Sequence, residues 1–175
     1  LVTAPTFAEY ERTPAGAEGR LHLLREDEGF AVTERILLDI TPEIDAVYLC
    51  NPNNPTGRTI EPQLLHRVVE KCEQNDIWLI VDECFNDFLT DSARHTLKAR
   101  LADYPKLVIL RAYTKMYAVP GVRFGWCMAA NTELIEGLYR AGQPWNVSVI
   151  AQACAAAAAG EAENAAQTGA RIAAE

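Results

Sequence analysis

The chain has 175 residues, of which 49% are hydrophobic, and it carries a formal net charge of −8 at pH 7. It is long enough to bury a sizeable core as one domain, and its acidity argues against a surface for nucleic acid or for an anionic membrane. The five cysteines and three histidines share no ligand spacing, which predicts no metal site and no disulfide framework but the reduced, buried thiols of a cytoplasmic protein.

Short apolar runs alternate with amphipathic stretches along the chain. Leu1–Ala4 reads as a strand already in progress, and the nearly continuous runs 45–50, 77–81 and 106–110 predict parallel strands covered on both faces. Between the first two of these runs, apolar residues recur at helical spacing over 62–72, beginning with a proline that suits a first helical turn. This alternation predicts an α/β fold with a doubly wound, mostly parallel sheet in three layers.

The second half of the chain predicts one more strand and then helices. Residues 124–130 read as the strand, and 131–140 as a helix. The alanine-rich segments 147–159 and 161–175 also favour helices, with Gly160 as the break between them.

Both ends of the chain look cut, because a strand is in progress at Leu1 and a helical pattern continues to Glu175 without a stop signal. We therefore expect residues 1–175 to be the central fragment of a longer polypeptide. No apolar run approaches the roughly 20 residues that a membrane-spanning helix requires.

Three strings carry the chemistry: NPNNPTG at 51–57, IWLIVDE at 77–83 and RAYTKMYAVPGVRFG at 111–125. Together they supply a turn asparagine, a strand-end carboxylate, an amine and an arginine. Lys115 follows a predicted strand, and ligands of open α/β sheets bind outside the carboxyl ends of the strands. A pyridoxal-phosphate enzyme needs an amine for a Schiff base, a carboxylate for the pyridinium nitrogen, and cationic and hydroxyl donors for the phosphate.

The order and wording of these strings resemble the class I and II aminotransferases, the fold-type I family, over nearly the whole chain from Pro5 to about Ala159. The resemblance implies the large domain of that fold and pyridoxal 5′-phosphate as its cofactor. It implies two catalytic residues: Lys115 would form the Schiff base and then shuttle a proton, and Asp82 would keep the ring nitrogen protonated.

The same resemblance implies the other cofactor contacts. Asn54 would hydrogen-bond the 3′ oxygen, Thr114 and Arg123 would bind the phosphate, and Phe7 would stack on the pyridine ring. Phe85 stands where most such aminotransferases have a tyrosine that donates to the 3′ oxygen. Without the resemblance, Asp82 reads as a helix cap or loop carboxylate, and Arg123 as half of a surface ion pair.

The combination of PTFAEY, DECFNDF, LRAYTKMYAVPGVRFGW and QPWNVSVIAQ is most similar to the threonine-phosphate decarboxylases, which are close relatives of the histidinol-phosphate aminotransferases. This implies a small amino-acid substrate, possibly phosphorylated, and a homodimer in the full-length protein. The family's phosphate-binding glycine turn would precede Leu1, and its carboxylate-gripping arginine and small domain would follow Glu175. The sequence therefore leaves transamination and decarboxylation both open.

The sequence also suggests two other interpretations. LIVDE resembles the Walker B strand of a nucleotide hydrolase, but the phosphate loop that such an enzyme requires has no counterpart in this chain. An aminotransferase-like domain reused for binding or regulation stays open, although the retained Lys115 and Asp82 argue against it.

Overall fold

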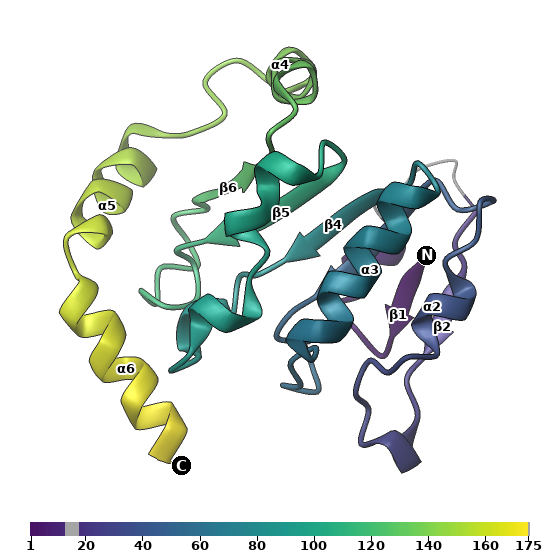
Figure 1. Ribbon diagram of the computed structural model, residues 1–175. Helices are drawn as coiled ribbons and strands as arrows, with labels where there is room; N and C mark the ends of the chain where they lie inside the picture. Colours follow the sequence, from purple (N-terminus) through teal and green to yellow (C-terminus); the bar gives the residue numbers. More distant parts are fainter. Residues whose placement is uncertain (13–17, 175) are drawn as a thin grey trace.

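The computed structural model describes residues 1–12 and 18–174. Its centre is a six-stranded sheet with the order β2-β1-β3-β4-β5-β6 (Figure 1). The strands are β1 Val2–Ala4, β2 Leu21–Leu23, β3 Ala46–Cys50, β4 Trp78–Asp82, β5 Leu107–Ala112 and β6 Gly125–Met128. Neighbouring strands are parallel except β5 and β6, which pair antiparallel. The mostly parallel α/β sheet predicted from the sequence is thus confirmed.

Helices flank this sheet. The α-helices are α1 Glu9–Arg12, α2 Ile36–Asp39, α3 Pro62–Gln74, α4 Thr132–Ala141, α5 Val149–Ala159 and α6 Ala162–Ala174. Short 3-10 helices cover Glu26–Glu28, Asn86–Phe88, Ser92–His95 and Lys98–Asp103. In Figure 1, α2 and α3 lie in front of the sheet, and α5 and α6 descend along the side where β6 forms the edge. No helix in the described ranges combines the length and apolar character needed to cross a bilayer.

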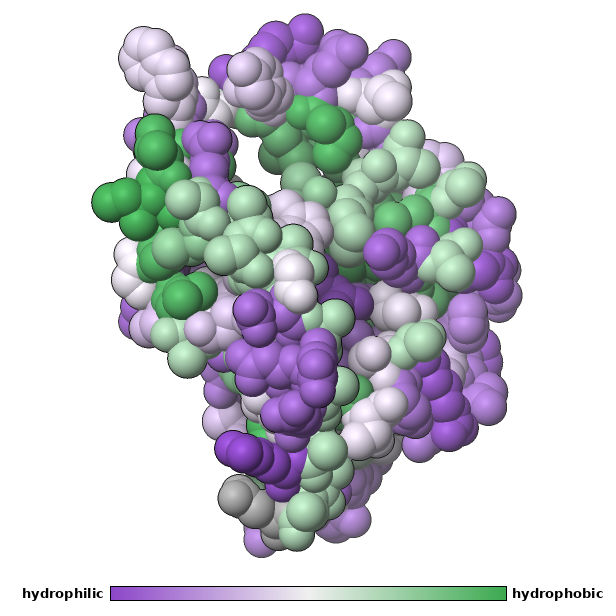
Figure 2. Space-filling model, turned by 90° about the vertical axis from the view of Figure 1, so that its left-hand side faces the viewer, coloured by the Kyte–Doolittle hydropathy of each residue, from purple (hydrophilic) through white to green (hydrophobic). Residues whose placement is uncertain are grey.

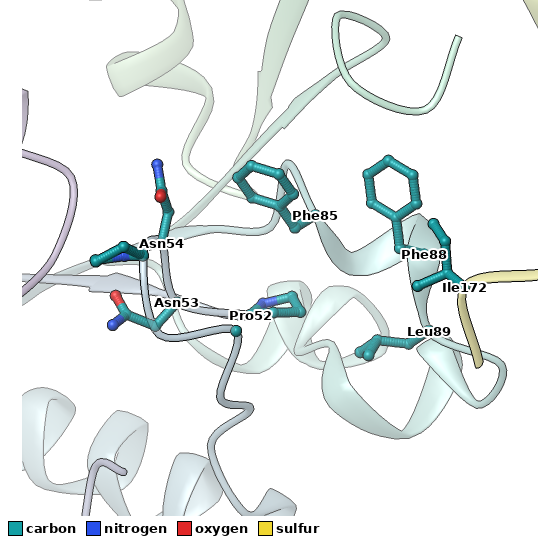
Figure 3. Close-up of a pocket in the computed structure, with 9 residues that line it drawn as sticks. Pro52, Asn53, Asn54, Phe85, Phe88, Leu89 and Ile172 are labelled. Atoms are coloured by element: carbon teal, nitrogen blue, oxygen red, sulfur yellow. The ribbon is translucent and has the colours of Figure 1, made fainter. Parts of the chain in front are cut away.

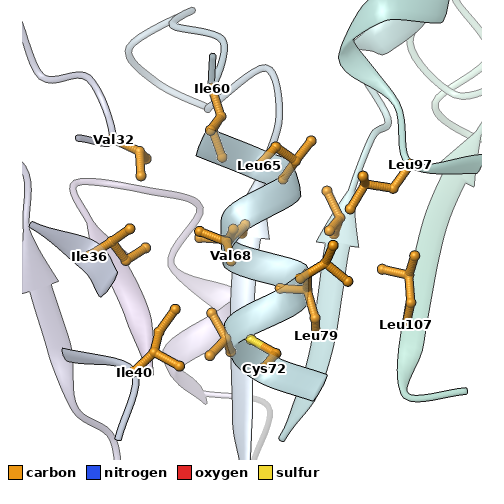
Figure 4. Packing of buried hydrophobic residues seen from close by; sticks show 14 of the residues in the cluster. Val32, Ile36, Ile40, Ile60, Leu65, Val68, Cys72, Leu79, Leu97 and Leu107 are labelled. Atoms are coloured by element: carbon orange, nitrogen blue, oxygen red, sulfur yellow. The ribbon is translucent and has the colours of Figure 1, made fainter. Parts of the chain in front are cut away.

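The main core lies between α3 and one face of the sheet. As the helical spacing predicted, Leu64, Leu65, Val68, Val69 and Cys72 of α3 are all buried. Figure 4 shows α3 in the middle of this cluster, with residues of the α2 region on one side and of β4 and β5 on the other. Each fully buried aliphatic side chain contributes about 1.5–3 kcal/mol, so this face fixes the strands that carry the polar residues at their ends.

Alternation along β3 and β4 decides which residues face away from α3. Val47 and Leu49 point into the main core, so Tyr48 and Cys50 point to the opposite face of the sheet. There they pack with Val2 and with Tyr10 of α1. The register pairs Cys50 with Asp82, so the Asp82 carboxylate also lies on this second face.

The predicted elements are found with small shifts at their ends, and β6 is shorter than the predicted strand 124–130. The sequence did not predict β2, α1, α2 or the 3-10 helices. The expectation of buried cysteines is correct for Cys50 and Cys72 but wrong for Cys84, Cys127 and Cys154, which are half-buried. Cys127 lies on the edge strand and Cys154 on α5, where little packs against them; all five cysteines are free.

The helices α4 and α5 bury little of their surface against the rest of the chain. No residue of α4 is buried, and in α5 only Ala151 and Ala158 are. In Figure 2, which faces the side of the molecule with α5 and α6, hydrophobic residues gather at the height of α4 and α5. The exposed large hydrophobic residues of this region are Ile135, Leu138, Tyr139, Trp145, Val149 and Ile150, and we call them the α4–α5 patch.

Candidate active site

A cavity of about 260 Å³ opens beside the carboxyl ends of β3, β4 and β5, on the face of the sheet opposite to α3. Its lining residues are Phe7, Tyr10, Cys50, Asn54, Asp82, Cys84, Phe85, Ala112, Thr114, Lys115 and Arg123. The chain runs from β1 to β2 on one side and reaches β3 on the other, so the strand order reverses here. Open α/β sheets bind ligands at such a reversal.

The structure brings all seven sequence-predicted residues together around this cavity: Phe7, Asn54, Asp82, Phe85, Thr114, Lys115 and Arg123. They come from segments after β1, β3, β4 and β5, which parallel pairing brings to one edge of the sheet.

Asp82 is the last residue of β4, and both of its carboxylate oxygens accept hydrogen bonds. The hydroxyl of Tyr10 donates to Oδ2 at 2.6 Å, and the backbone N–H of Cys84 donates to Oδ1 at 2.8 Å. Asp82 thus caps a turn rather than a helix, and its carboxylate is held in one orientation at the wall of the cavity.

Lys115 lies in the turn that follows β5. Backbone hydrogen bonds from Tyr117 to Tyr113 and from Val119 to Thr114, both 3.2 Å, close the turn. The turn exposes the Lys115 side chain, and Nζ lies 5.4 Å from the centre of the Phe85 ring. A cation at this distance from an aromatic face is attracted to it, which helps to direct the amine into the cavity.

The three asparagines of the NPNNPTG loop have different roles: two hold the loop in place, and the third faces the cavity. Asn51 is fully buried, and its side chain accepts from the Ile60 N–H at 2.9 Å and donates to the His95 carbonyl at 3.0 Å. Asn53 is also committed, because its amide donates to the carbonyl of Pro5 at 3.0 Å and to Thr56 Oγ1 at 2.9 Å. Asn54 lines the cavity, and no described residue hydrogen-bonds its side-chain amide. The loop is a scaffold that leaves one amide available to a ligand.

Arg123 and Phe7 also line the cavity. Arg123 Nη1 donates to the Pro120 carbonyl at 3.1 Å, and the guanidinium makes no ion pair with a described residue, so the surface ion pair considered above is not formed. Phe7 is 45% exposed, and its ring meets the Tyr10 ring edge-on at 5.5 Å between centres. Both side chains therefore remain available to a bound molecule.

A buried ion pair fixes the strand ends behind the cavity. Glu83 is fully buried, and Arg111 donates from Nη2 to its Oε2 at 2.7 Å. Arg111 also donates from Nη1 to Asp87 at 2.6 Å, and the Thr96 hydroxyl donates to Glu83 at 2.7 Å. Burial raises the pKa of Glu83, although Thr96 and Arg111 oppose that shift. Because Glu83 follows β4 and Arg111 belongs to β5, the pair holds Asp82 and the Lys115 turn in a fixed relation.

A second cavity of about 420 Å³ adjoins the first and shares Asn54 and Phe85 with it (Figure 3). Its other walls are mostly apolar. They include Phe88 and Leu89, which follow β4, and Ile172, which belongs to α6.

Sequence reasoning missed four residues that line the first cavity: Tyr10, Cys50, Cys84 and Ala112. Tyr10 follows Phe7 by one helical turn, and that spacing could have placed it on the same face. Cys50 pairs with Asp82 in the sheet and Ala112 ends β5, so the arrangement of the strands, and not their own sequences, brings both to the cavity. Burial, followed by the charge of Asp82, raises the pKa of the Cys84 thiol, which keeps it neutral. Among the described residues, no three His, Cys, Asp or Glu side chains are grouped to hold a metal ion.

The side chains of this cavity fit the cofactor that the sequence implied. An amine, a carboxylate, a guanidinium, a hydroxyl and an unpartnered amide share one hollow with an exposed aromatic ring. These are the groups that a phosphorylated pyridine aldehyde would need for its carbonyl, ring nitrogen, phosphate, phenolic oxygen and ring face.

The chain is similar in sequence and in structure to several known proteins. The chain is 38% identical over 153 residues to the threonine-phosphate decarboxylase of Salmonella typhimurium, which covers 86% of this chain and 42% of that protein. It is 32% identical over 162 residues to a histidinol-phosphate aminotransferase of Lactiplantibacillus plantarum, covering 90% and 44%. The crystal structure of the histidinol-phosphate aminotransferase of Clostridium acetobutylicum superposes with a TM-score of 0.87 at 27% identity, covering 95% of this chain and 50% of that one.

The chain therefore spans about two fifths of the length of the curated relatives it matches. The family model described as Aminotransferase class I and II matches residues 1–175, the whole of the chain. With that match, the fold and the composition of the cavity agree, and the chain belongs to the class I and II aminotransferases, whose cofactor is pyridoxal 5′-phosphate.

Proposed function

We propose that residues 1–175 are the cofactor-binding large domain of an enzyme that acts on a small amino acid through a Schiff base on Lys115. In this proposal an N-terminal segment and a C-terminal small domain of the full-length protein complete the site. The observation that carries it is the convergence of Lys115, Asp82 and the five other predicted residues on one cavity.

The residues of the cavity have distinct roles in this proposal. The bound cofactor supplies an electron sink for the α-carbon of the amino acid. Lys115 holds and moves a proton at that carbon, and the Asp82 carboxylate favours a proton on the ring nitrogen because opposite charges stabilise each other.

The other contacts hold the cofactor in place. Arg123 and Thr114 bind the phosphate, for which a guanidinium fork is well shaped. Asn54 donates to the 3′ oxygen, and Phe7 packs on the ring face. Phe85 supplies no hydrogen-bond donor beside that oxygen, which leaves Asn54 as the donor among the predicted contacts.

The reaction is one of two related kinds. The likeness to the threonine-phosphate decarboxylase of Salmonella typhimurium, together with Phe85, supports a decarboxylase acting on a phosphorylated hydroxy-amino acid. The likeness to histidinol-phosphate aminotransferases supports transamination as the alternative. Measuring carbon dioxide against keto acid released by the full-length protein from such a substrate separates the two.

A non-catalytic reuse of the domain is the competing function. It is disfavoured because the exposed amine of Lys115 and the oriented carboxylate of Asp82 line the same cavity, whereas a purely structural domain has no need of both. A nucleotide hydrolase has no support in the site.

The deciding experiment is chemical trapping. We expect borohydride reduction of the full-length protein loaded with pyridoxal phosphate to leave a pyridoxyl label that peptide mapping places on Lys115. Lys115→Arg should abolish the label, whereas the matched variant Lys98→Arg should retain it. A label on Lys71, Lys98 or Lys106 instead would overturn the assignment, and a full-length protein that takes no label at all would favour the non-catalytic alternative.

We further propose that the full-length protein is a homodimer of the cytoplasm. The free thiols of all five cysteines support a reducing compartment. The α4–α5 patch supports a second copy as the partner, since monomeric proteins seldom expose large apolar clusters.

A further inference from the structure

The phenol of Tyr10 is directed into the protein and binds Asp82. Tyr10 is only 8% exposed, and its hydroxyl donates to Asp82 Oδ2 at 2.6 Å across 72 positions of sequence. Such a short hydrogen bond to a carboxylate is of the strong, charge-assisted kind. The bond joins the segment after β1 to the end of β4, on the wall of the proposed cofactor cavity.

The Tyr10 ring is fixed from two sides. The Phe7 ring meets it edge-on at 5.5 Å, and the Tyr48 ring of β3 stacks on it at 6.3 Å between centres. Val2 and Cys50 complete the cluster around it. The hydroxyl is therefore placed by packing on the sheet and not by the Asp82 bond alone, so it can impose an orientation on the carboxylate.

Tyr10 is a permanent donor in this pair. Burial, followed by the charge of Asp82, raises the pKa of the Tyr10 phenol, so its proton stays in place at any physiological pH. The other carboxylate oxygen is held by the Cys84 N–H at 2.8 Å. Because Tyr10 and Cys84 engage different oxygens, rotation of the carboxylate would break both bonds.

We propose that Tyr10 is the positioning residue of the cofactor site: it holds the Asp82 carboxylate oriented toward the ring nitrogen. The inference rests on the proposed function, in which Asp82 is the partner of that nitrogen. Tyr10 acts through Asp82 and is not itself a catalytic residue. The ring stacker Phe7 and the orienting Tyr10 thus belong to one short segment, so docking of this segment sets both the ring face and its nitrogen partner.

The test compares wild type with Tyr10→Phe, which removes the hydroxyl and keeps the ring. Pyridoxal phosphate labelled with ¹⁵N in the ring reports the protonation of its nitrogen by NMR, and an absorbance titration gives its affinity. We expect Tyr10→Phe to move the ¹⁵N shift toward that of neutral pyridine and to weaken affinity by about tenfold, the size of one hydrogen bond to a charged group. The matched control is Tyr48→Phe, which touches the same ring but does not line the cavity; it should leave the shift unchanged.

Asp82→Asn completes a double-mutant cycle that separates orientation from general stability. If Tyr10 acts through Asp82, adding Tyr10→Phe to Asp82→Asn should weaken the affinity much less than it does in wild type. A wild-type ¹⁵N shift in Tyr10→Phe, or full additivity in the cycle, would overturn the inference and leave the proposed function standing. A full-length wild-type protein that binds no pyridoxal phosphate would overturn both.

Discussion

In the proposed site, Phe85 occupies a position where a hydrogen-bond donor would change the chemistry of the cofactor. Its ring is 5.4 Å from the Lys115 amine and lines the same cavity as Asn54. A tyrosine hydroxyl there would stabilise negative charge on the 3′ oxygen. Such a bond is worth about 1.5–3 kcal/mol, or roughly one to two pH units of a coupled titration.

We therefore expect Phe85→Tyr in the full-length protein to lower the pH midpoint of the absorbance change of the bound cofactor by about one to two units. Phe88→Tyr is the matched control, because Phe88 neighbours Phe85 but lines only the second cavity. An unshifted midpoint in Phe85→Tyr would remove residue 85 from the neighbourhood of the 3′ oxygen.

Single residues differ in how far the sequence could place them. Lys115, Asp82 and Asn54 could be predicted as site residues, because each lies in a distinctive sequence motif next to a strand end or turn that the sequence also predicts. Tyr10 could not be assigned to Asp82, because their contact depends on the order of β1, β3 and β4 in the sheet. Likewise, the hydrogen bond from the Asn53 side chain to the Pro5 carbonyl forms only in the folded chain. The sequence alone therefore could not show which asparagine of the loop remains free to bind a ligand.

Among the elements, β4 and β5 are held together behind the site by the Glu83–Arg111 pair. The Glu83 side chain is fully buried and that of Arg111 is 12% exposed. Removing one partner of such a pair leaves an uncompensated buried charge, which costs about 3–5 kcal/mol. The sequence shows both residues but gives no sign that they meet.

We expect Arg111→Met to lower the free energy of unfolding by about 3–5 kcal/mol at neutral pH, as measured by urea denaturation. Burial already raises the pKa of Glu83, and losing Arg111 should raise it further. A carboxyl group whose pKa is raised on folding contributes its full stability below its unfolded pKa, where it is neutral in both states. That stability is lost as the pH rises through the folded pKa, because the buried group then becomes charged. The penalty of Arg111→Met should therefore shrink as the pH is lowered.

Arg100→Met supplies the control for this experiment, since Arg100 pairs with the exposed Asp103 and should cost only about 0–1 kcal/mol. An Arg111→Met penalty no larger than that of Arg100→Met, or one that grows toward acid pH, would contradict the role assigned to the buried pair.

The strands and helices with strong local patterns were predictable, and the short ones were not. The strands β3, β4 and β5 consist of nearly continuous apolar residues, and α3 carries a regular buried stripe. By contrast, β2 has three residues and pairs with β1, and Leu24, which follows it, donates its N–H to the Ala4 carbonyl at 2.7 Å. Pairing with β1 stabilises β2, so the three residues of β2 carry no pattern from which a strand could be predicted.

At the scale of the whole molecule, the α4–α5 patch is a large apolar surface on helices that bury few residues against the described part of the chain. Trp145 is 95% exposed and Tyr139 86%. A buried aromatic side chain covers about 150–250 Å², so these two alone would supply a large part of the roughly 800 Å² that each partner contributes to a standard interface. The charge of −8 on each copy opposes association, so the apolar contact must outweigh that repulsion.

If this patch joins two copies, the double variant Trp145→Ser, Tyr139→Ser should shift the sedimentation equilibrium from dimer to monomer. Added salt should tighten the wild-type dimer by screening the repulsion between its acidic copies. Leu38→Ser is the matched control, because Leu38 is an exposed apolar residue (78%) on α2, outside the patch. A double variant that remains dimeric would place the interface elsewhere, and a wild-type chain that stays monomeric at every concentration would mean that residues 1–175 do not pair through this surface.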